Sequence, residues 1–71
     1  MEKLLQQLSE LLEIDAIDAA KSFNEYDEFD SLACLSILAL LDSEYHTSMT
    51  YKDIASFRSI EDFCKEVLSR Q

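Results

Sequence analysis

The residues of this chain that could take part in covalent chemistry are few. They are the adjacent pair Asp30 and Ser31, the cysteines Cys34 and Cys64, and the only histidine, His46. A serine or cysteine nucleophile needs a base within hydrogen-bonding reach. If Ser31 begins a helix, His46 lies beyond the far end of that helix, about 15 positions away at a rise of about 1.5 Å each. We therefore expect neither Ser31 nor Cys34 to be activated from within the chain.

The two cysteines and the histidine do not have the spacing of a metal site. There is no CxxC or HxxxH pair, so a zinc site would need scattered carboxylates, and we expect no metal. Cys34 and Cys64 both lie within apolar, periodic segments. This favours two buried free thiols in a reducing compartment, although a single disulfide remains an alternative.

The length and charge of the chain limit the classes of function. Its 71 residues predict one domain over residues 1–71, too small for a deep catalytic cleft, and we expect no enzyme. Fifteen acidic residues against six basic ones give a net charge of −9, which disfavours nucleic acid and anionic membranes as partners. The charge is consistent either with solubility alone or with steering toward basic patches on partner proteins. The N-terminal segment resembles neither a signal peptide nor a membrane span, so we expect a cytoplasmic protein.

Helical periodicity and capping residues predict an all-α fold, a small four-helix bundle in which three longer helices accompany a short third one. The chain has no glycine and no proline, so the boundaries are inferred from apolar spacing and caps. Thr50 and Ser59 are each followed three residues later by an acid, the pattern of a capping box. The predicted helices span about residues 2–13, 31–45, 51–57 and 60–70.

The acidic segment 14–30 is predicted to be a long loop between the first two helices. Its apolar residues have no regular period, and we expect them to attach the loop to the core. They are Ile14, Ile17, Phe23, Tyr26 and Phe29. Long ordered loops in compact domains are uncommon and often functional.

The helix that follows is apolar on two sides. Asp30 is a plausible N-cap, which places Ser31 at the first helical position. One face, which we expect in the core, contains Cys34, Ile37, Leu38, Leu41 and Tyr45. Leu32, Leu35 and Ala39 lie nearly opposite. They are either buried by the long loop or exposed as a strip that binds partner proteins; we favour exposure, because the strip adjoins Ser31.

The order of these elements, with Asp30, Ser31 and Leu32 at the start of an apolar second helix, resembles the acyl carrier protein family. Tyr45, and the stretch SMTYKDIASFRSIEDFCKEVL, support the resemblance over nearly the whole chain. It implies that Ser31 is the attachment point of 4′-phosphopantetheine, with Asp30 beside it as helix cap. A separate phosphopantetheinyl transferase would supply the base and the metal, and the arm would carry acyl or aminoacyl groups as thioesters.

The chain differs from the common pattern of that family at several positions. Phe29 stands where many members have glycine, and Ala33 and Ser36 stand where many have acids. We therefore expect acyl-loading, condensing or transferring enzymes to recognise mainly the apolar strip and nearby acids. The candidate partner-binding residues are Leu32, Leu35, Ala39, Asp42, Glu28 and Asp27.

These differences favour a carrier dedicated to a specialised pathway at least as much as one in housekeeping fatty acid synthesis. We expect a monomeric carrier that serves fatty acid, polyketide or other specialised biosynthesis. The alternative is an unmodified helical adaptor that docks partners through the same strip.

Overall fold

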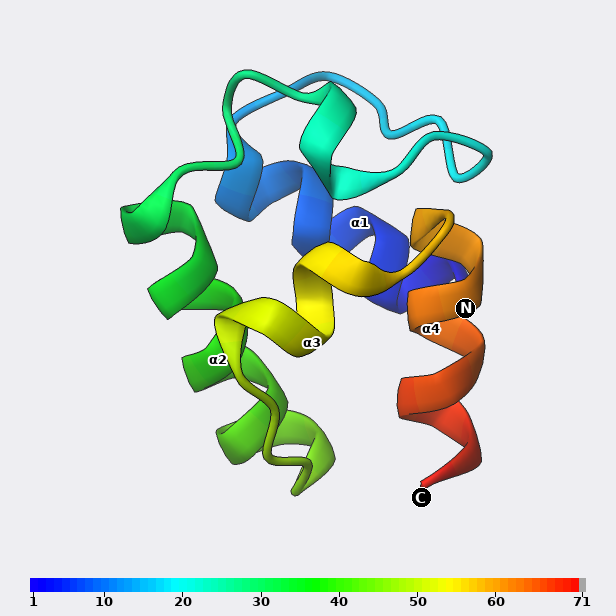
Figure 1. The fold of residues 1–71 in the computed structure, drawn as a ribbon. Coiled ribbons are helices and arrows are strands. Elements are labelled where there is room, and N and C mark those ends of the chain that lie inside the picture. The colour runs from blue at the N-terminus through cyan, green and yellow to red at the C-terminus, as the bar shows by residue number, and fades with distance from the viewer. Residues whose placement is uncertain (71) are drawn as a thin grey trace.

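The computed structural model describes residues 1–70, which form four α-helices (Figure 1). They are α1 (Glu2–Leu12), α2 (Ser31–Tyr45), α3 (Tyr51–Ser56) and α4 (Ile60–Ser69), and a short 3-10 helix, η1 (Phe23–Glu25), lies in the loop between α1 and α2. No strand occurs among the described residues. The predicted fold class, three longer helices and a short third one with a long first connection, is confirmed.

The helix boundaries agree with the predicted ones to within a residue. Helix α2 spans the predicted residues, whereas α1, α3 and α4 each end one residue earlier. At the end of α1, Glu13 adopts a left-handed conformation with φ 58°, and His46 does the same after α2 with φ 49°. In a chain without glycine, ordinary residues must occupy these terminating positions, at an energetic cost.

The core is formed by the apolar stripes of α1, α2 and α4, closed by the loop and α3. The predicted inward residues of α1 and α4 are buried except Leu5, Leu11 and Leu68, which are partly buried. On α2 the burial also differs in detail from the expectation. Leu38 and Tyr45 are only partly buried, and Ala33, which was not predicted to face inward, is 8% exposed. The buried apolar residues are Leu4, Leu8, Leu12, Phe23, Phe29, Ala33, Cys34, Ile37, Leu41, Met49, Ile54, Ile60, Phe63, Cys64 and Val67.

The loop between α1 and α2 is held to the bundle by backbone hydrogen bonds as well as by side chains. The N–H groups of Ile60 and Glu61, at the start of α4, donate to the carbonyl oxygens of Lys21 (2.8 Å) and Ala19 (2.9 Å). Asn24, in η1, donates to the carbonyl of Ala55 at 3.0 Å. Loop carbonyls thus satisfy donors that have no partner within α4.

The aromatic and aliphatic loop residues pack as predicted. Phe23 and Phe29 are buried, and Ile14, Ile17 and Tyr26 lie partly buried against the core. The turn at η1 was not predicted, because its bonds close over only three residues and it has no apolar period.

Both cysteines are buried free thiols, so the disulfide alternative is wrong. Burial raises the pKa of Cys34, and raises the pKa of Cys64 to about 11.

Within the described residues there is no group of three or more histidine, cysteine or acidic side chains placed to bind a metal ion. None of the helices described is both long enough and apolar enough to cross a membrane.

Candidate functional site at the start of helix α2

Asp30 caps helix α2 and fixes the position of the residue that follows it. Its backbone is extended (φ −111°, ψ −172°), and its Oδ1 accepts a hydrogen bond from the N–H of Ala33 at 2.8 Å. The Asp30 carbonyl accepts the first bond of the helix, from the N–H of Cys34 at 2.9 Å. The predicted N-cap is therefore confirmed, and Ser31 is the first helical residue.

Ser31 is exposed at the end of the helix where free N–H groups gather. The N–H groups of Ser31 and Leu32 precede the first bond within α2, and the aligned peptide dipoles make this end positive. An anion attached here would be favoured by about 0.3–1 kcal/mol, and the neighbouring Asp30 carboxylate would oppose part of that effect. The surroundings of the hydroxyl therefore fit a phosphodiester, with a small net electrostatic preference.

Phe29 anchors the chain immediately before the cap. Its ring is 8% exposed and packs against Phe23, with ring centroids 5.0 Å apart. On its other side it stacks on Tyr51 of α3 at 5.6 Å, with the ring planes 19° apart. Phe23 in turn meets Phe63 of α4 edge-on at 5.0 Å. The Phe29 ring is thus held directly by two aromatic residues, Phe23 and Tyr51, and it fixes the backbone immediately before Asp30 and Ser31.

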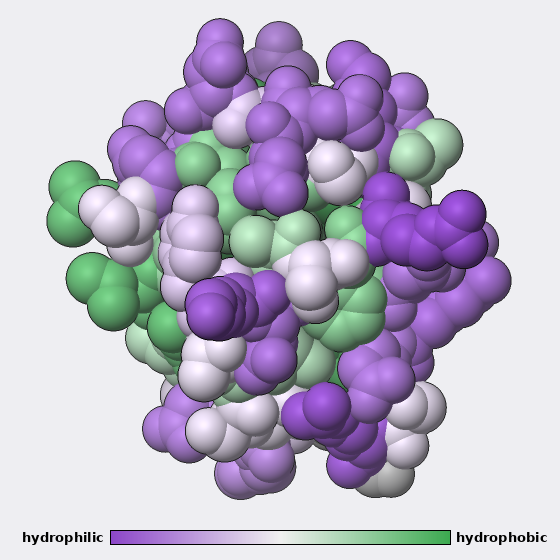
Figure 2. Space-filling model, viewed as in Figure 1, coloured by the Kyte–Doolittle hydropathy of each residue, from purple (hydrophilic) through white to green (hydrophobic). Residues whose placement is uncertain are grey.

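The apolar strip beside Ser31 is exposed, and the alternative in which the loop covers it is wrong. Leu32 is 74% exposed and Leu35 63%, and Ala39 is also exposed. Figure 2 shows apolar side chains projecting at the edge of the molecule where the first half of α2 lies in Figure 1. Large apolar side chains with this exposure are typical of an interaction surface when they are contiguous.

The acidic residues predicted to bind partners lie in two separate places, one on α2 and the other in the loop before it. Asp42 is exposed on α2, and its i, i+3 spacing makes it a neighbour of Ala39. It is 11 residues from Ser31, which corresponds to about 16 Å along the helix. Asp27 and Glu28 are exposed in the loop just before the cap.

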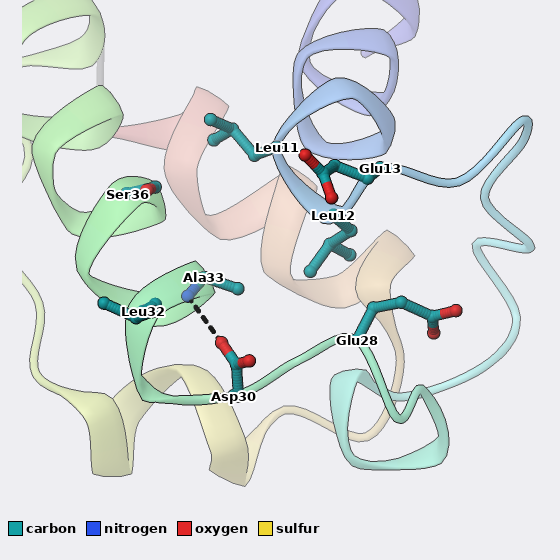
Figure 3. Close-up of a pocket in the computed structure, with 8 residues that line it drawn as sticks. All are labelled: Leu11, Leu12, Glu13, Glu28, Asp30, Leu32, Ala33 and Ser36. Carbon is teal, nitrogen blue, oxygen red and sulfur yellow. Dashed lines mark hydrogen bonds between the residues drawn. The ribbon is translucent and has the colours of Figure 1, made fainter.

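A cavity of about 390 Å³ opens directly beside the cap, and it was not predicted from the sequence. It lies where the end of α1, the end of the loop and the first turns of α2 meet (Figure 3). Of the predicted residues it brings together Glu28, Asp30 and Leu32; Asp27, Leu35, Ala39 and Asp42 are not part of its lining. The other lining residues are Leu11, Leu12, Glu13, Ala33 and Ser36.

The only histidine of the chain is far from Ser31. His46 is the cap at the opposite end of α2, 15 residues away, or about 22 Å along the helix. The ion pairs among the described residues are Lys65 with Glu61 on α4, and Arg70, the residue that follows α4, with Glu66. The site therefore offers an exposed hydroxyl beside an exposed apolar strip, with His46 too far away to act as a base on that hydroxyl.

A helical bundle with an exposed serine at the capped start of its second helix is the architecture of a carrier domain. The family model described as phosphopantetheine attachment site matches residues 2–67, and the chain belongs to this family. Members carry covalently attached 4′-phosphopantetheine and act as non-catalytic carriers. No curated protein and no solved structure matches the chain significantly. The family thus accounts for the fold and for the cofactor.

Proposed function

We propose that this protein is a discrete acyl carrier protein that bears 4′-phosphopantetheine on Ser31. The thiol at the end of the arm carries an acyl or aminoacyl group as a thioester and delivers it to partner enzymes. The observation that carries the proposal is the exposed Ser31 hydroxyl at the first position of α2, in a chain that belongs to the phosphopantetheine family.

The attachment reaction needs a second protein. A phosphopantetheinyl transferase would form the bond between the Ser31 oxygen and the phosphorus of coenzyme A that bears the pantetheine. The nucleotide part of coenzyme A leaves, and the hydroxyl proton passes to a base of the transferase. This division of labour agrees with the distance of His46 from Ser31, since the only histidine of the chain cannot reach the hydroxyl.

The partner surface in this proposal is the exposed strip of Leu32, Leu35 and Ala39, flanked by acids. Asp42 lies at one end of the strip, and Asp27 and Glu28 lie in the loop at the other. Ala33 and Ser36 add no charge to α2, so the apolar contacts provide most of the affinity and the acids assist association.

The proposed setting is a single domain over residues 1–71 that works as a monomer in the cytoplasm and catalyses no reaction itself. The two free thiols support a reducing compartment. Helix α2 has Ala33 and Ser36 at positions where many acyl carrier proteins have acidic residues. This difference supports a pathway other than housekeeping fatty acid synthesis, such as polyketide or another specialised biosynthesis.

Intact-mass measurement tests the proposal. The purified protein is incubated with coenzyme A and a permissive phosphopantetheinyl transferase, alongside Ser31→Ala and the matched control Ser36→Ala, which alters another exposed serine of α2. We expect one phosphopantetheine on the wild type and on Ser36→Ala, and none on Ser31→Ala. An unmodified wild type, or modification that persists in Ser31→Ala, would refute the proposal.

If Ser31 is not modified, the exposed strip of Leu32, Leu35 and Ala39 would be explained by the alternative function, an unmodified helical adaptor that docks partner proteins. In that case a partner would bind Ser31→Ala as tightly as the wild type and would lose affinity for a Leu32→Ser and Leu35→Ser double variant.

A further inference from the structure

Helix α3 reaches the attachment site through the ring of Tyr51. Tyr51 is the first residue of α3, and its ring stacks on that of Phe29, with the centroids 5.6 Å apart and the planes 19° apart. Figure 3 shows the pale yellow ribbon of α3 beneath the segment that leads to Asp30. Along the chain, only Asp30 therefore separates the stacked ring of Phe29 from Ser31.

Local hydrogen bonds shape the backbone that leads to the attachment serine. The N–H groups of Phe29 and Asp30 donate to carbonyl groups only three and two residues earlier in the chain, at 3.1 and 3.0 Å. Both bonds close within the same segment, so they form a turn without joining it to the rest of the bundle. The ring of Phe29 makes that connection, because it is 8% exposed and packs against Phe23 of η1 and Tyr51 of α3.

The two rings that hold Phe29 differ in how firmly they are fixed themselves. Phe23 is buried and also packs edge-on against a ring of α4. Tyr51 is 48% exposed and belongs to a helix of six residues, which is too short to be stable by itself in water. The capping box of Thr50 and Asp53 holds the first turn of this helix. The ring of Tyr51 is therefore the contact to Phe29 that one substitution can remove without opening the buried core.

We infer that Tyr51 is a positioning residue for attachment of the arm. Through Phe29, its ring holds the segment before the cap and so fixes how Ser31 is presented to the transferase. The inference rests on the proposed attachment at Ser31, and it adds a residue of α3 on which the reaction depends without contact with the reacting atoms. Without the stack, the start of α2 opens more often, so a smaller fraction of the bound carrier has its hydroxyl in the reactive geometry.

A positioning role and a direct contact with the transferase predict different kinetics. If Tyr51 acts through Phe29, a carrier without the stack binds as before but reacts more slowly once bound, so kcat falls and KM for the carrier is unchanged. If the exposed part of the Tyr51 ring contacts the transferase in both the ground state and the transition state, its loss raises KM and leaves kcat unchanged.

Initial rates of phosphopantetheine transfer, measured against carrier concentration at saturating coenzyme A, test the inference. Tyr51→Leu keeps an apolar side chain that favours helix but removes the ring, and Tyr51→Phe keeps the ring. The matched control is Phe57→Leu, which removes a ring at the other end of α3, where Phe57 meets Phe63 edge-on at 5.6 Å. We expect Tyr51→Leu to lower kcat about two- to tenfold, the range of an aromatic pair, with KM unchanged. Tyr51→Phe and Phe57→Leu should keep the wild-type kcat.

Hydrogen exchange of the protein without the arm tests the same link independently of the transferase. The N–H groups of Ala33 and Cys34 donate to Asp30 and report opening at the start of α2, and that of Leu41, farther along the helix, serves as the reference. Tyr51→Leu should speed exchange at Ala33 and Cys34 about two- to tenfold relative to Leu41. Phe57→Leu should not change this ratio.

Several results would overturn the inference. They are an unchanged kcat for Tyr51→Leu, a rise in KM alone, an equal loss of kcat in Tyr51→Phe or Phe57→Leu, and exchange at Ala33 and Cys34 that does not respond to Tyr51→Leu. A wild type that accepts no phosphopantetheine would refute the carrier proposal and with it the role in transfer. The exchange rates then decide separately whether Tyr51 holds the start of α2, so the two failures are distinguished.

Discussion

Substitution of Asp30 tests how the start of α2 is stabilised, because this side chain contributes both a capping hydrogen bond and a negative charge, and the two contributions can be measured separately. Asp30→Ala removes the acceptor that lies 2.8 Å from the Ala33 N–H and also removes a negative charge from the positive end of α2. Loss of an N-cap costs about 0.5–2 kcal/mol, and loss of the charge about 0.3–1 kcal/mol. We therefore expect Asp30→Ala to lower the free energy of unfolding by about 1–3 kcal/mol. Asp30→Asn keeps an acceptor and should lose only the charge contribution.

Urea denaturation followed by circular dichroism, at low salt and in 1 M salt, measures both contributions. The deficit of Asp30→Asn should largely disappear in 1 M salt because the charge is screened, whereas Asp30→Ala should retain the deficit of the missing cap. Asp27→Ala is the control: it removes an exposed acid outside any helix and should change stability by no more than about 0.5 kcal/mol. Equal losses for Asp30→Ala and Asp30→Asn, at both salt concentrations, would refute this description of the cap.

The same series tests the proposed position of the arm. A phosphodiester on Ser31 places an anion next to the Asp30 carboxylate, and the two charges repel. Attachment of the arm should therefore stabilise Asp30→Asn more than it stabilises the wild type, by about 0.3–1 kcal/mol, the size of a charge effect at a helix end. An identical change in both proteins would show that the phosphate does not lie near the cap.

Two further predictions concern stability away from the site. His46→Gly should raise the free energy of unfolding by about 0.5–1 kcal/mol in urea denaturation, because glycine adopts the left-handed conformation at φ 49° without the steric cost that histidine bears. Alkaline pH should destabilise the protein through Cys64. Burial raises the pKa of this thiol from 9.0 to about 11, so its contribution is complete below pH 9 and is lost as the pH rises through about 11. A shift of this size corresponds to roughly 2–3 kcal/mol, measured as the difference between the wild type and Cys64→Ala from pH 8 to 11.

Each of these predictions has its own control and its own contradicting result. Glu44→Gly places glycine in the last turn of α2 with helical geometry and should lower stability by about 1 kcal/mol, so a loss in both glycine variants would contradict the explanation for His46. For Cys64, unfolding free energies of wild type and Cys64→Ala that run parallel from pH 8 to 11 would show that the thiol does not titrate differently in the folded protein.

Local rules in the sequence determined most of the helices and the position of the serine. Asp30, Thr50 and Ser59 accept hydrogen bonds from the N–H groups three residues later, as their residue types and spacing predicted. The complete capping box forms only at Thr50, whose N–H donates to Asp53; at Ser59 the returning bond to Asp62 is not found. Such caps involve atoms within one turn, so they can be inferred without knowing the rest of the fold. Helical spacing placed Leu32 and Leu35 opposite the core face of α2 but did not decide between burial by the loop and exposure; the exposure was favoured because the strip adjoins Ser31, and it is confirmed.

Only the tertiary structure decided how the loop, the cap and the cavity fit together. The bonds from Ile60 and Glu61 to loop carbonyls join residues about 40 positions apart, and carbonyl groups are present at every residue, so no side-chain pattern identifies the two that accept. The stacking of Phe29 on Tyr51 depends on where α3 crosses the loop. The cavity depends on the separation of α1 from α2, which the packing of the entire core determines and no single segment encodes.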